Sequence, residues 1–67
     1  MRNRNYVYFV LFGNDRYHPE CHFSACQEKF NYLKDARAFA KLYSNAYIFK
    51  AHLAPDSGDI LSIVDVF

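Results

Sequence analysis

A run of seven apolar and aromatic residues near the start of the chain, YVYFVLF at Tyr6–Phe12, constrains the fold more than any other feature. Its composition predicts a strand, and the turn-forming residues Gly13-Asn14-Asp15 end it. Side chains alternate across a strand, so both faces of this one are apolar, which is typical of a strand covered on both sides. The run is too short to cross a bilayer and lacks the cleavage pattern of a signal peptide. We therefore expect a cytoplasmic protein.

The rest of the chain predicts two hairpins around one helix. Residues 16–25 are expected to return as an irregular edge strand, because Pro19 cannot donate to a ladder. A helix is expected next, with Asn31 as its cap and Asn45 as the left-handed residue that ends it; its apolar stripe is Leu33, Ala36, Phe39, Ala40 and Tyr43. Residues 46–54 and 59–67 read as strands joined by a Pro55–Gly58 turn. The prediction is one α+β domain over residues 1–67, with a mainly antiparallel four-stranded sheet in ββαββ order and the helix packed on one face.

One helix cannot cover such a sheet. Four strands make a sheet roughly 19 Å wide and a helix is about 10 Å across, so about half of one face is shielded. Tyrosine hydroxyls and the polar Lys50 and His52 suggest which face is uncovered, and we expect an open face made of Tyr6, Tyr8, Phe12, Ile48, Lys50 and His52. The helix is then expected over Tyr47, Phe49, Ala51 and Leu53. The alternative is that the sheet curls or that residues 16–30 fold over it.

Charge is unevenly distributed although the formal net charge is only +1. Residues 29–50 carry five basic residues against Asp35, a net +4, and residues 51–67 carry three aspartates and no basic residue, a net −3. Lys34, Arg37 and Lys41 fall on the polar side of the expected helix. They are either a second partner-binding surface or an ordinary solvated face.

The densest group of reactive side chains is His18, Cys21, His22 and Cys26, which are ligands that zinc accepts. Their spacing argues against a metal site, because His18 and His22 would lie about 13 Å apart in an extended segment. A Cys21–Cys26 disulfide would need a tight turn and an oxidising compartment, so free thiols are expected. The chain has two glycines, which excludes phosphate-binding loops, and no oxyanion loop accompanies the cysteines. We expect no enzymatic activity and no cofactor.

The functional hypothesis is a non-enzymatic protein–protein interaction module whose partner is a larger host protein or a second copy, as a homodimer that uses the aromatic sheet face. The chain begins with Met1 and is expected to be a complete small gene product. By general analogy, such products include phage and mobile-element factors that inhibit a host complex. Two alternatives stay open: single-stranded nucleic-acid binding through exposed aromatics with Arg2, Arg4 and Lys50, and a small zinc-binding domain.

Overall fold

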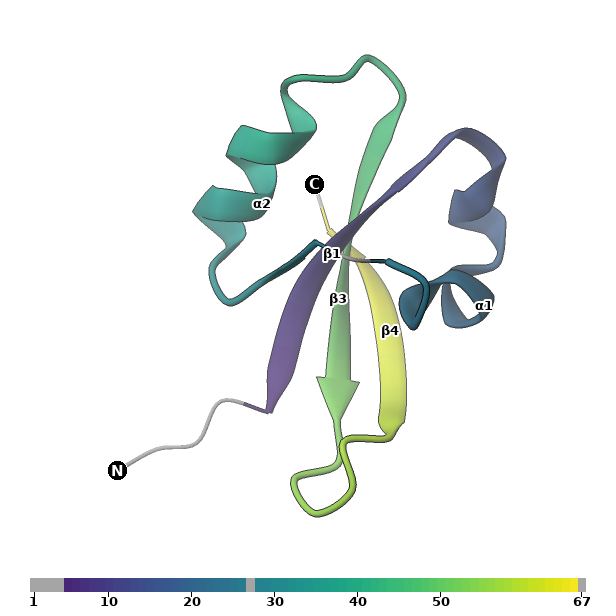
Figure 1. Ribbon diagram of the computed structural model, residues 1–67, viewed down its shortest axis with the longest axis vertical. Coiled ribbons are helices and arrows are strands. Elements are labelled where there is room, and N and C mark those ends of the chain that lie inside the picture. The colour runs from purple at the N-terminus through teal and green to yellow at the C-terminus, as the bar shows by residue number, and fades with distance from the viewer. Residues whose placement is uncertain (1–4, 27, 67) are drawn as a thin grey trace.

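The computed structural model describes residues 5–26 and 28–66 and confirms the α+β prediction (Figure 1). Its elements, in chain order, are strand β1 (Tyr6–Phe12), 3₁₀ helix η1 (Gly13–Tyr17), helix α1 (Pro19–Phe23), strand β2 (Lys29–Phe30), helix α2 (Leu33–Ala40), strand β3 (Ala46–Leu53) and strand β4 (Ile60–Val66). No helix in the described ranges is long and apolar enough to cross a membrane.

The four strands form one antiparallel sheet in the order β2-β1-β3-β4. The two central strands pair along their whole length, from Tyr6 opposite His52 to Phe12 opposite Ala46. Strand β4 pairs with β3 from Val66 opposite Ile48, and an irregularity after His52 leaves Leu61 as an extra residue. The position of β1 inside the sheet fits its two apolar faces.

The three long strands lie within a residue of their predicted ranges, and position 67 falls outside the described residues. The prediction for residues 16–25 was wrong. That segment forms η1 and α1, and the second strand shrinks to Lys29–Phe30. The reason is that Pro19 occupies the first turn of α1, where its fixed φ and missing N–H are favourable.

Both predicted ends of the main helix were also wrong. Tyr32, not Asn31, occupies the N-cap position of α2, without a side-chain cap hydrogen bond. Asn45 is not left-handed, because no described residue other than glycine has a positive φ. At the C-terminal end, the Lys41 N–H instead donates to the carbonyls of Arg37 and Phe39.

The apolar core lies on both sides of the sheet, and Figure 1 shows α1 and α2 on opposite sides of the strands. On the α1 face, Phe9, Leu11, Phe49 and Ala51 are buried and contact Phe23 of α1. On the α2 face, Val10 and Ile48 are buried together with Ala36 of α2. Each helix covers the face that the other leaves uncovered.

This arrangement corrects the predicted orientation of the sheet. Helix α2 packs on the face that holds Phe12 and Ile48, which was expected to be open, and Ile48 is only 7% exposed. The opposite face, with Phe49 and Ala51, is covered by α1 rather than by α2. The alternative, in which residues 16–30 fold over the predicted open face, is not what the structure shows either, because α1 covers the opposite face. Alternation alone could not decide, because both faces of β1 are apolar and the polar Lys50 and His52 of β3 share a face with the buried Ile48.

Gly13 connects β1 to η1 with a φ of +58°, so we expect Gly13→Ala to destabilise the fold. A Cβ there would lie 3.7 Å from Nδ2 of Asn45, which is ordinary contact, so the cost comes from the backbone alone. The left-handed region costs an L-residue about 1–2 kcal/mol. Urea unfolding should show a loss of that size for Gly13→Ala and a smaller one for Gly13→Asn, because asparagine tolerates this conformation. Equal stability of Gly13→Ala and the wild type would contradict this prediction.

Candidate functional site

The predicted open face is divided along its length. At the end of the face where β1 ends and β3 begins, Phe12 and Ile48 pack in the cluster with Ala36 of α2. At the other end of the face, four half-buried side chains lie close together. The ring centres of Tyr6 and Tyr8 are 5.7 Å apart, and those of Tyr6 and His52 are 6.0 Å apart. Nζ of Lys50 lies 4.2 Å from the Tyr6 ring centre. The cation covers the aromatic face and a neighbouring ring meets it edge-on, so these residues shield one another rather than present a flat stacking surface.

The predicted basic residues of the helix lie together on one exposed surface. Lys34 and Arg37 are three residues apart and Lys41 follows four residues later, so they are neighbours on one face of the helical segment. They line a broad groove of about 790 Å³ together with Leu33, Ala38 and Leu42. Leu42 is 72% exposed, the largest exposed fraction among the described large hydrophobic residues. We call these six residues the α2 groove.

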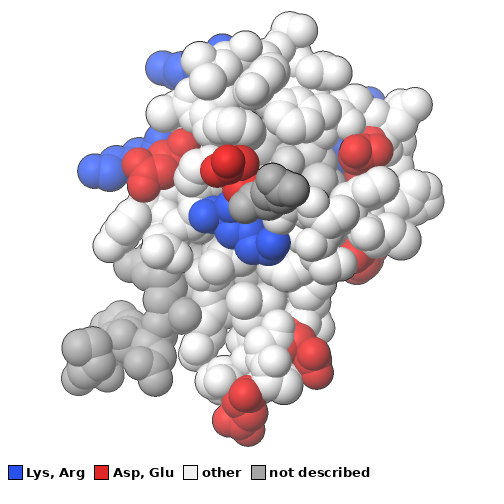
Figure 2. Space-filling model, in the orientation of Figure 1, with Lys and Arg blue, Asp and Glu red and all other residues white. Residues whose placement is uncertain are grey.

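Charged side chains of both signs are spread over the surface. Figure 2 shows basic side chains on the side that carries α2, with an acidic one beside them, and only acidic ones at the end formed by the turn between β3 and β4. Asp56 and Asp59 lie in the segment between these two strands. The α2 groove is thus a basic surface on a molecule whose formal net charge is only +1.

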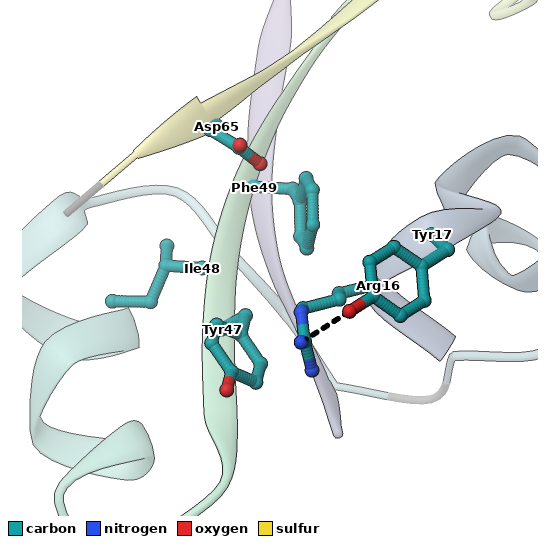
Figure 3. Close-up of a pocket in the computed structure, with 6 residues that line it drawn as sticks. All are labelled: Arg16, Tyr17, Tyr47, Ile48, Phe49 and Asp65. Carbon is teal, nitrogen blue, oxygen red and sulfur yellow. Dashed lines mark hydrogen bonds between the residues drawn. The ribbon is translucent and has the colours of Figure 1, made fainter. Parts of the chain in front are cut away.

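A smaller pocket of about 240 Å³ lies on the other side of the sheet, where η1 meets β3 and β4 (Figure 3). The Arg16 guanidinium lies between two rings, 4.4 Å from the centre of Tyr17 and 4.5 Å from that of Tyr47. It donates to the Gly13 carbonyl at 2.9 Å and to the Tyr17 hydroxyl at 2.5 Å. Asp65 lies at the far end of the pocket in Figure 3. The stacked guanidinium therefore links η1 to the first residues of β3.

Sequence reasoning missed this pocket. Arg16 and Tyr17 were placed in an irregular return strand, and Tyr47 was assigned to the core under the helix. Tyr47 is 36% exposed, and the Arg16 guanidinium of η1 lies over its ring. No local pattern signals a contact between residues thirty positions apart in the chain, so only the topology could have shown it.

The histidines and cysteines near α1 are not brought together. Cys21 is exposed, and Cys26 is half-buried and donates to the carbonyls of Val10 and Glu28 at 3.6 and 3.4 Å. Both are free thiols, as predicted. His22 Nε2 lies 3.5 Å from Asp15 Oδ1. Within residues 5–26 and 28–66, no three His, Cys, Asp or Glu side chains form a group that could hold a metal ion.

Comparison of the chain with known protein families, with curated proteins and with solved structures finds no match.

Proposed function

We propose that this chain is a non-enzymatic, cytoplasmic protein-interaction module that docks through the α2 groove onto an acidic surface of a larger protein. The observation that supports the proposal is the position of Leu42 within the row formed by Lys34, Arg37 and Lys41. An exposed apolar side chain surrounded by cations can anchor in a partner's pocket while the charges select and orient an acidic partner.

The composition of the groove favours a protein over a nucleic acid as the partner. Its lining contains three aliphatic side chains and three cations, and none of its six residues is aromatic. Single-stranded nucleic acids are bound by bases stacking on aromatic side chains beside basic residues. The aromatic rings of Tyr6 and Tyr8 lie on the sheet and have Lys50 beside them. The basic row and the aromatic cluster therefore do not form one stacking platform.

Reversing the charges of the α2 groove is expected to abolish capture of the partner. Lys34→Glu/Lys41→Glu turns attraction for an acidic surface into repulsion, and we expect at least a roughly ten-fold loss of affinity, which corresponds to about 1.4 kcal/mol. Quantitative affinity capture from cells that naturally express the chain, followed by titration of the captured protein, measures the loss. Wild-type capture should also weaken between low and high salt, because exposed charges are screened.

The matched control is Arg2→Glu/Arg4→Glu, which changes the net charge by the same amount elsewhere in the chain. It should retain capture, whereas Leu42→Asp should lose it. Equal loss in both double variants would show a general charge effect and contradict the proposal. Tight binding of a single-stranded oligonucleotide that is lost in Lys34→Glu/Lys41→Glu would assign the groove to nucleic acid and also contradict it.

A further inference from the structure

The two edges of the sheet are protected very differently. The β2 edge is two residues long and carries Lys29, and short length and lysine are devices that prevent edge pairing. The β4 edge is seven residues long, ILSIVDV, and has Asp65 as its one charged residue. Two of its side chains are strongly exposed hydrophobics, Leu61 at 67% and Val64 at 46%. An edge of this kind is a template for pairing with another strand.

The backbone groups that face outward on β4 follow from the hydrogen bonds of the neighbouring strands. At the two ends of the β1–β3 ladder, the Leu53 N–H donates to the Asn5 carbonyl at 2.7 Å and the Gly13 N–H donates to the Asn45 carbonyl at 3.0 Å. Odd-numbered residues of β3 therefore point their backbone groups toward β1, and even-numbered ones, such as Lys50, point toward β4.

The same alternation carries over to β4. Val64 is opposite Lys50 and directs its N–H and C=O toward β3, so those of Ile63 and Asp65 point away from the sheet. Among the described residues, no backbone hydrogen bond from another element reaches these outward groups. Two consecutive outward-facing residues can each exchange a pair of hydrogen bonds with an antiparallel strand.

Charge and regularity select one register if the added strand is β4 of a second copy. A two-fold axis at Ser62 would place Asp59 opposite Asp65 of the other copy. An axis at Asp65 would place the Asp65 residues of the two copies opposite each other. Both registers are unfavourable because like charges would lie directly opposite. An axis at Ile63 would require Leu61, the extra residue at the strand irregularity, to pair with Asp65 of the other copy. An axis at Val64 uses only the regular stretch Ser62–Val66 and pairs Ile63 with Asp65 in both directions.

We propose that the protein forms a symmetric dimer in which the β4 strands of two copies pair antiparallel about Val64 and join their sheets into one of eight strands. The contact satisfies the outward backbone groups of Ile63 and Asp65 and places the two exposed Val64 side chains against each other. It does not use the α2 groove, so it stands independently of the proposed function.

Oligomeric state and a register-specific crosslink test the dimer. Sedimentation equilibrium should give twice the 7.9 kDa chain mass for the wild type and 7.9 kDa for Val64→Lys, with the circular dichroism spectrum unchanged. Leu42→Lys introduces the same charge at an exposed hydrophobic of the α2 groove and should remain dimeric. A wild-type protein that is monomeric up to millimolar concentration would overturn the proposal, as would a monomeric Leu42→Lys beside a dimeric Val64→Lys.

For the crosslink, cysteines are introduced singly into a Cys21→Ser/Cys26→Ala background. Val64 lies opposite its own counterpart in a pair whose Cα atoms are about 4.5 Å apart, within the range for a disulfide. Ser62 lies opposite Val66, so its counterpart is about 13 Å further along the strand. Mild oxidation should give a covalent dimer with Val64→Cys and little with Ser62→Cys. The reverse order, or no difference between the two, would overturn the register and with it the proposal.

Discussion

Phe9→Ala is expected to lower the free energy of unfolding by about 3–5 kcal/mol, a large part of the stability of a chain this short. Phe9 is completely buried, and its ring lies 5.0 Å from that of Phe23 in α1 and 5.6 Å from that of Phe49 in β3. It therefore joins the helix to both central strands. Removing a buried phenylalanine side chain costs about 3–5 kcal/mol. At about 0.05–0.15 kcal/mol per residue, a chain of this length has roughly 3–10 kcal/mol of stability in all.

Urea unfolding followed by far-ultraviolet circular dichroism measures this effect. Phe9→Leu keeps most of the apolar volume and should cost much less than Phe9→Ala. Leu42→Ala removes an exposed side chain of similar size and should change the free energy of unfolding by no more than about 0.5 kcal/mol. A Phe9→Ala variant within about 1 kcal/mol of the wild type would mean that the cluster between α1 and the sheet is not a packed core.

The long strands could be predicted because each is a dense apolar run bounded by turn residues. β1 ends at Gly13, and the hairpin of β3 and β4 turns through Pro55–Gly58, where Gly58 has a φ of +78°. The segment between β1 and α2 could not be predicted in the same way. A helix of five residues such as α1 is shorter than two turns and shows no period, and its position is fixed by the contact of Phe23 with Phe9.

The orientation of the sheet was mispredicted because one face was treated as uniform along its length. The reasoning that tyrosine hydroxyls keep contact with water fits Tyr6 and Tyr8, which are only half-buried although Tyr8 packs at the margin of the cluster under α2. Two strand positions above Tyr8, Val10 is buried against α2 on that same face. Side-chain alternation identifies a face but not how far a helix extends over it.

The candidate site was predictable where it depends on helical spacing alone. Lys34, Arg37 and Lys41 share a surface because their spacing matches the helical repeat, whichever sheet face the helix covers. The exposure of the β4 edge could not be predicted from the sequence. Its exposure depends on the strand order, in which β4 is last, and on the phase of the hydrogen bonds between β1 and β3.

Ala36→Asp is expected to detach α2 from the sheet and unfold the domain. Ala36 has no exposed surface and packs with Val10 and Ile48, so its position has room for a methyl group and is surrounded by hydrocarbon. No side-chain N or O atom is buried without a partner in the described residues, so the wild-type core contains no such defect. A carboxylate placed there loses its water, and burying a polar group without a hydrogen bond costs about 2–7 kcal/mol. The upper part of that range exceeds the stability of many domains this small.

Ala38→Asp is the matched control, because it introduces the same residue two positions later on the exposed side of α2. It carries the same change in charge and a similar loss of helix propensity, so it should unfold within about 1 kcal/mol of the wild type. Thermal unfolding and near-ultraviolet circular dichroism should separate the two variants, with cooperative unfolding lost in Ala36→Asp only. If both variants were equally stable, α2 would not be packed on the face of Val10 and Ile48. The basic row would then have no fixed position relative to the sheet, because Ala36 holds the opposite side of the helix against β1 and β3.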